Sequence, residues 1–132
     1  MRIFQCGGVV GALLALSGCG ESTSLPTAEP MGADDFRREL VDVPLCGTPK
    51  TGPVAGKAMC TIHFADGTTT LAWAGAVARG FWEVEGPTIC RRDIRDSVDQ
   101  RRCVSYERLS NGHYRNSDGV EFCLGPCSQP PR

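Results

Sequence analysis

The sequence predicts an all-β domain: an antiparallel meander of about seven short strands that forms a small barrel or half-barrel and is stapled by disulfides. Three observations support this. Short runs alternate between apolar and polar residues with the period of two that is typical of half-buried strands. Turn dipeptides separate these runs, at Asp66-Gly67, Asn111-Gly112 and Asp118-Gly119. No long helical period follows residue 42, and six cysteines lie between residues 46 and 127.

The strands are expected in chain order from residue 57. In 57–64 the alternation predicts a strand in which one set of side chains faces the core and the other, more polar set faces solvent. The inward set is Ala58, Cys60, Ile62 and Phe64, and the polar set is Lys57, Met59, Thr61 and His63. The later strands are expected at 68–73, 81–84, 88–92, 103–109, 113–116 and 120–124. Phe81 and Trp82 are adjacent, so they should point to opposite faces of their strand, with one of them outside the core.

The segments between and before these strands are expected to be less regular. Residues 34–40 can form one or two helical turns, with Asp34 as the N-cap and Phe36 and Leu40 on one side. The Gly- and Pro-rich stretch 45–56 and the charged stretch 91–102 are expected to be loops.

The N-terminal segment has the features of a signal peptide. Arg2 supplies a positive start, and an uncharged, largely apolar run follows from Ile3 to Gly18. This run is shorter than the ~20 residues that span a bilayer, so it fits a cleaved h-region better than a membrane helix. Residues 1–18 are therefore expected to be removed from the mature protein.

The end of that run resembles the lipobox of bacterial lipoproteins, in the residues Leu16-Ser17-Gly18-Cys19. The resemblance implies that Cys19 carries lipid and anchors the chain in the cell envelope, with the outer membrane favoured over the inner because Gly20 follows it. Residues 19–34 would form a flexible tether, 35–127 the β-domain and 128–132 a tail. The alternative is an ordinary secretory signal, cut near Ser17 or Gly20.

Composition limits the possible functions. Removing 18 signal residues from 132 leaves 114, which is one domain of ordinary size. Loss of Arg2 takes the formal net charge from −1 to −2, so no basic excess points to nucleic acid. The partners expected are the membrane, through the lipid anchor, and an envelope protein or a small ligand.

The cysteines of the domain indicate disulfides, as is usual for a small exported protein. They are Cys46, Cys60, Cys90, Cys103, Cys123 and Cys127. Cys90–Cys103 is the preferred pair, because it joins strands that are expected to be neighbours. The other four remain open: Cys46 and Cys60 can combine with Cys123 and Cys127, or each pair can close on itself. A redox or zinc site at Cys123 and Cys127, completed by His63 or His113, is the weaker alternative, because no Cys-X-X-Cys is present.

No catalytic grouping, metal site or cofactor motif is recognisable. His63 and His113 are both expected on the surface, and no Gly-X-Ser-X-Gly elbow supports a serine nucleophile. The arginine-rich stretch that begins at Arg91 and ends at Arg102 mixes both charge signs, which favours a solvated loop over an anion site.

A second resemblance covers roughly residues 45–127. Gly56-Lys57, Gly80-Phe81-Trp82, Ile89-Cys90 and Asp118-Gly119 resemble a pattern in small exported bacterial proteins of uncharacterised function, which implies an exported β-meander and no activity. The sequence thus favours a non-enzymatic envelope lipoprotein with a binding or structural domain. Alternatives are a small-ligand-binding barrel, an inhibitor of host lysozyme or a thiol redox protein.

Overall fold

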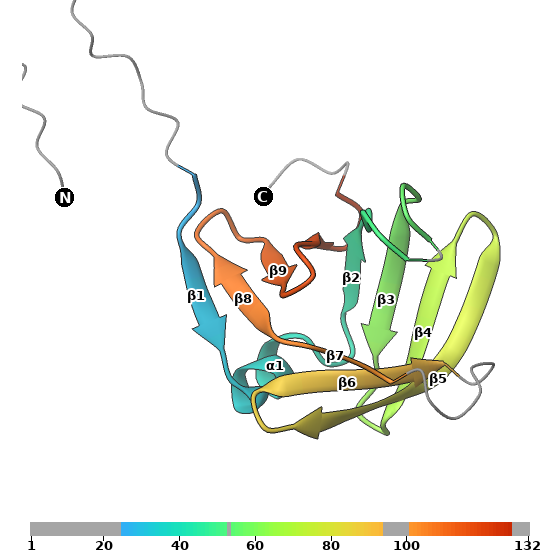
Figure 1. Ribbon diagram of the computed structural model, residues 1–132, viewed down its shortest axis with the longest axis horizontal. Helices are drawn as coiled ribbons and strands as arrows, with labels where there is room; N and C mark the ends of the chain where they lie inside the picture. The colour runs from blue at the N-terminus through green and yellow to red at the C-terminus, as the bar shows by residue number, and fades with distance from the viewer. Residues whose placement is uncertain (1–24, 53, 94–100, 128–132) are drawn as a thin grey trace, which may run out of the picture.

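The computed structural model describes residues 25–52, 54–93 and 101–127, which form one antiparallel sheet of ten strands and one short helix (Figure 1). The elements are β1 (Ala28–Met31), α1 (Ala33–Glu39), β2 (Pro44–Gly47), β3 (Met59–His63), β4 (Thr68–Trp73), β5 (Ala76–Glu85), β6 (Thr88–Asp93), β7 (Arg102–Val104), β8 (Tyr106–Leu109), β9 (Tyr114–Asn116) and β10 (Glu121–Leu124). The strand order is β1-β8-β9-β10-β2-β3-β4-β5-β6-β7.

The sheet curls strongly but does not close, because β1 and β7 are its two edges. The first part of β5 pairs along the whole of β4, and in Figure 1 the rest of β5 and β6 run across the ends of β3 and β4, with helix α1 beside them. The all-β, disulfide-stapled fold is confirmed as an open, half-barrel-like arrangement, with ten strands in place of about seven. No helix in the described part of the chain is long and apolar enough to cross a membrane.

Strand β1 lies inside the segment 19–34 that was expected to be tether. It pairs in full with β8, from Ala28 opposite Leu109 to Met31 opposite Tyr106. Pro30 is tolerated because β1 is an edge strand, where a missing N–H need not break a ladder. Met31 is buried in the core. The ordered domain therefore begins before residue 35 and includes β1.

Strand β2 lies at the start of the segment 45–56 that was expected to be loop. Leu45 and Cys46 are buried, and β2 pairs with β3 on one side and with β10 on the other. The composition of 45–56 predicted a loop because Gly- and Pro-rich residues follow this short strand directly. The remaining stretch up to residue 56, apart from residue 53, contains no strand, as expected.

Helix α1 begins after Gly32, not after Asp34 as expected. The Asp35 carboxylate accepts a hydrogen bond from the Gly32 backbone N–H at 3.1 Å, so an acidic side chain stabilises the start of the helix from inside its first turn. Phe36 and Leu40 lie on one side and are both fully buried, as their spacing predicts. Helix α1 therefore seals one end of the curled sheet.

The inward phase of β3 is the reverse of the expected one. Met59, Thr61 and His63 are buried, whereas Cys60 and Ile62 are only partly so. His63, expected on the surface, is 1% exposed and packs edge-on against the rings of Phe36 and Trp82. Both sets of the alternating pattern contain apolar residues. The period of two therefore identified the strand, but it could not show which set of side chains faces the core.

Trp82 and Phe81 point to opposite faces of β5, as expected. The Trp82 ring packs 5.6 Å from that of Phe36, and its Nε1–H donates to the Phe64 carbonyl at 2.7 Å. Phe81 is 47% exposed. The Phe36 and Tyr106 rings lie 5.1 Å apart, so a compact aromatic cluster fills the end of the half-barrel next to α1.

Three disulfides link the described cysteines, and each pair closes locally. Cys46–Cys60 joins directly opposed residues of β2 and β3, and Cys90–Cys103 does the same for β6 and β7. Cys90–Cys103 is the pair that the strand order favoured. Cys123–Cys127 spans only the turn that follows β10. Cys19, the signal residues 1–18 and the tail 128–132 lie outside the described residues.

Candidate ligand-binding pocket

The interior of the half-barrel is hollow at the end away from α1. A pocket of about 530 Å³ lies between β3 and β4 on one side and β7, β8 and β10 on the other. Its volume falls within the range of about 300–1,000 Å³ that is typical of small-molecule sites. Six side chains supply most of the apolar wall: Met59, Leu71, Trp73, Val104, Val120 and Phe122.

Arg91 supplies the inward-facing positive charge of this pocket. It lies on β6, two residues after the buried Ile89, so it points to the same face of the strand. Its side chain is 22% exposed. One terminal nitrogen donates to Thr61 Oγ1 at 3.2 Å, and the other lies 3.3 Å from Asp93 Oδ1.

Thr61 is fully engaged by its surroundings. Its hydroxyl donates to the Thr70 backbone carbonyl at 2.9 Å and accepts the bond from Arg91. Thr61 thus ties the guanidinium to the β3–β4 pair, and the position of Arg91 is fixed by two strands that are not its sheet neighbours. A cation held in this way is preorganised for an anionic group in the pocket.

Tyr106, on β8, contributes a phenol to the same lining. Burial raises the pKa of Tyr106 to about 12, the nearby Arg91 charge opposes this shift, and Asp118 adds to it. The phenol therefore stays protonated at neutral pH and can donate a hydrogen bond. Among the described residues, its hydroxyl has no hydrogen-bond partner.

The mouth of the pocket has both charge signs. Arg102 and Asp118 are exposed there, and Pro49, Thr51 and Val54 come from the segment that follows β2. Exposed charges at a rim are well solvated and contribute little to binding energy. The chemistry of the interior is therefore set mainly by Arg91, Tyr106 and the apolar wall.

The arginine-rich stretch was expected to be one solvated loop, but both of its ends belong to strands. Arg91 and Asp93 belong to β6 and are partly buried, and Arg102 begins β7. Residues 94–100 lie outside the described residues. The sequence did carry one signal of the site: Arg91 occupies the same phase as Ile89 in a predicted strand, and a charge on an inward phase needs a partner or a ligand.

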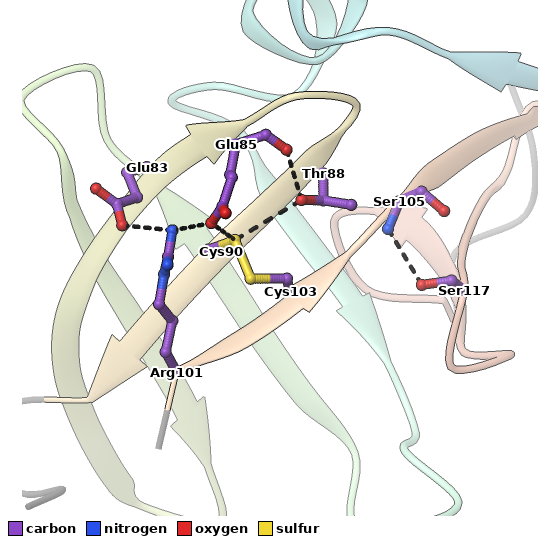
Figure 2. The surroundings of a disulfide bond; sticks show 8 residues. All are labelled: Glu83, Glu85, Thr88, Cys90, Arg101, Cys103, Ser105 and Ser117. Carbon is purple, nitrogen blue, oxygen red and sulfur yellow. Dashed lines mark hydrogen bonds and ion pairs between the residues drawn. A yellow bond between two sulfur atoms is a disulfide. The ribbon is translucent and has the colours of Figure 1, made fainter. Parts of the chain in front are cut away.

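The second charged cluster of the region surrounds the Cys90–Cys103 disulfide. Figure 2 shows the Arg101 guanidinium between the carboxylates of Glu83 and Glu85. A Glu85 oxygen lies 3.7 Å from Cys90 Sγ. Glu85, Cys90 and Cys103 resemble a three-ligand metal set, but both sulfurs are bonded in the disulfide and the Glu85 carboxylate is paired with Arg101. The cluster is best described as a structural link at the surface, in which the disulfide joins β6 to β7 and Arg101 forms ion pairs with β5.

The two histidines lie in different places. His63 belongs to the aromatic cluster, where burial, with a further contribution from the Arg91 charge, lowers its pKa to about 3. His63 Nδ1 has no hydrogen-bond partner among the described residues. His113 is partly exposed, and its Nε2 lies 3.8 Å from Cys123 Sγ. Of the two histidines considered with Cys123 and Cys127, only His113 is near, and the two sulfurs are bonded to each other.

Comparison with known proteins adds no relative. No family model matches the chain, and neither the curated proteins nor the solved structures contain a significant match.

Proposed function

We propose that this chain is a non-enzymatic lipoprotein of the bacterial cell envelope whose β-domain binds a small ligand inside its half-barrel. The pocket of about 530 Å³ carries the proposal. It combines an apolar wall with a few convergent polar groups, which is the usual composition of a small-molecule site.

The covalent framework supports a preformed site. Cys46–Cys60 ties β2 to β3, and Cys90–Cys103 ties β6 to β7. Strands β3, β6 and β7 all supply lining residues, namely Met59, Arg91 and Val104. A pocket whose walls are fixed before binding loses less conformational entropy when the ligand enters, so affinity is higher for the same contacts.

The proposed anchor places this pocket close to a membrane. Eight residues separate Cys19 from Ala28, where β1 begins. Even when fully extended, such a segment reaches roughly 28 Å. A lipid on Cys19 would therefore keep the domain near the surface of the bilayer, with the outer membrane favoured, where small amphipathic molecules are concentrated.

One experiment tests both parts of the proposal: native mass spectrometry of the protein purified from its own membranes, followed by digestion without reduction. We expect an acylated peptide that begins at Cys19, and a small molecule bound to the intact domain. Substitution Ala78→Trp fills the pocket and should abolish the adduct, whereas Val77→Trp, on the exposed face of the same strand, should retain it.

The outcomes separate clearly. An unlipidated N-terminus contradicts the anchor. A wild-type domain without any adduct, or an adduct that persists in a folded Ala78→Trp variant, contradicts the binding site. Circular dichroism of the two tryptophan variants shows whether each has kept its fold.

A further inference from the structure

We propose that the pocket selects a small molecule with an apolar body and one carboxylate, and that Arg91 is the residue that binds the carboxylate, with the Tyr106 hydroxyl as a second donor. This inference rests on the proposed function of the pocket and adds the chemistry of its ligand. The argument concerns which hydrogen-bonding groups of the interior are already satisfied and which are not.

The Arg91 guanidinium has donors to spare. It carries five N–H groups in a planar fork. Thr61 and Asp93 each accept one of them, and no other described residue accepts the remaining three. The Asp93 contact, at 3.3 Å, is longer than the roughly 2.7–2.9 Å of a strong charge-assisted bond. A planar carboxylate can form two parallel bonds with such a fork, which a neutral hydroxyl cannot.

The Tyr106 hydroxyl is the second unused donor of the interior. It stays protonated at neutral pH and lines the same pocket as Arg91. Both side chains line this one pocket, Arg91 from β6 and Tyr106 from β8, so a single ligand can contact both. A ligand oxygen in the pocket can accept the hydrogen bond that this hydroxyl donates.

The sign of the ligand charge follows from where the lining carboxylates lie. Asp93 already faces Arg91, and Asp118 is exposed at the rim, where water screens it. Of this charged pair the Arg91 guanidinium is the less exposed, at 22% against 34% for the Asp93 side chain, so the positive group is the more desolvated one. A cationic ligand would meet Arg91 in a partly desolvated site, and a neutral one would leave the donors unpaired. The apolar wall that includes Leu71 and Trp73 accommodates the rest of the molecule.

Three twelve-carbon probes test this chemistry: dodecanoate, dodecan-1-ol and dodecyltrimethylammonium, each kept below its aggregation limit. Binding at pH 7.5 can be followed by titration calorimetry and by tryptophan fluorescence, because Trp73, one of the two tryptophans, lies at the pocket wall. For the wild type we expect dodecanoate to bind at least about ten-fold more tightly than dodecan-1-ol, because a charge-assisted pair is lost in the alcohol. The ammonium compound should bind most weakly.

The matched variants are Arg91→Gln and Arg92→Gln, because Arg92 is the exposed neighbour on the opposite face of β6. Arg91→Gln should weaken dodecanoate binding to about the level of the alcohol while alcohol binding stays unchanged, which also shows that the pocket is intact. Arg92→Gln should leave all three affinities as they are. Tyr106→Phe should lower dodecanoate affinity by a smaller factor than Arg91→Gln does.

Equal affinity for dodecanoate and dodecan-1-ol in the wild type overturns the inference but leaves a ligand-binding pocket standing. Binding of dodecanoate that is insensitive to Arg91→Gln overturns it as well. If none of the probes binds, the inference fails, and the native mass spectrum decides independently whether the pocket holds a ligand of another class.

Discussion

The two ends of the half-barrel differ in how completely they are filled. Next to α1, the interior is packed by the buried side chains of Phe36, Leu40, His63 and Tyr106, together with the partly buried Trp82. At the other end the same curled sheet encloses the pocket. There the strands keep their pairing, but side chains do not fill the space. The difference indicates that the filled end supplies stability and leaves the hollow end available for binding.

Truncation of one side chain at each end should show the largest contrast. Phe36→Ala removes a fully buried ring from the filled end and should lower the free energy of unfolding by about 3–5 kcal/mol. Leu71→Ala enlarges a space that is already open and should cost about 1 kcal/mol. Urea unfolding of both variants measures the two losses. Similar losses would contradict the division of roles between the ends.

The contribution of each disulfide to the free energy of unfolding should depend on the length of chain that it closes and on the strands that it joins. Cys90 and Cys103 are 13 residues apart and join two strands at the pocket. In the chain-entropy model the bridge contributes about 3 kcal/mol, so a Cys90→Ala, Cys103→Ala double variant should lose about that much. Cys123–Cys127 closes only a turn, with a separation of 4, and its removal should cost about 2 kcal/mol.

Equilibrium unfolding under non-reducing conditions measures both double variants against the wild type. Ligand binding sharpens the comparison, because loss of Cys90–Cys103 should also weaken binding at the pocket, whereas loss of Cys123–Cys127 should not. A larger loss of stability at the C-terminal pair would show that the local turn, and not the strand pairing at the pocket, limits the stability of the fold.

The parts of the fold that follow from local pattern could be predicted from the sequence. Asp66-Gly67 and Asp118-Gly119 mark turns, β-branched runs mark the strands beside them, and Phe36 and Leu40 identify the buried side of α1. These features depend only on neighbours in the chain. The Cys90–Cys103 pair belongs with them, because it requires only that consecutive predicted strands lie side by side.

The parts that depend on distant partners could not be predicted. Strand β1 forms because β8 offers an edge, and nothing in the polar sequence around Pro30 reveals that edge. The phase of β3 depends on which face the sheet curls toward, so the alternating pattern alone could not show that His63 is buried. The pocket arises from side chains far apart in sequence, such as Thr61 and Tyr106, whose common location appears only when the sheet is curled.

His63 allows the comparison between the two ends to be sharpened by pH. Burial lowers its pKa to about 3 in the folded protein, below its usual value of 6.5. The unfolded chain therefore binds a proton on this ring near pH 6.5, while the folded chain resists doing so. Between these two values stability falls with decreasing pH by about 1.4 kcal/mol per unit. We expect His63 alone to cost about 2–3 kcal/mol at pH 4.5 relative to neutral pH.

The control for this effect is His63→Leu, which fills a similar volume without a titrating group. The free energy of unfolding of the wild type minus that of the variant should fall from pH 7 to pH 4.5. Carboxylates such as Glu39, whose pKa is lowered by its bond to Arg108, titrate in both proteins and cancel in this difference. A difference that is flat over this range would show that water reaches the ring, and hence that the filled end is less tightly closed than its packing against Phe36 and Trp82 indicates.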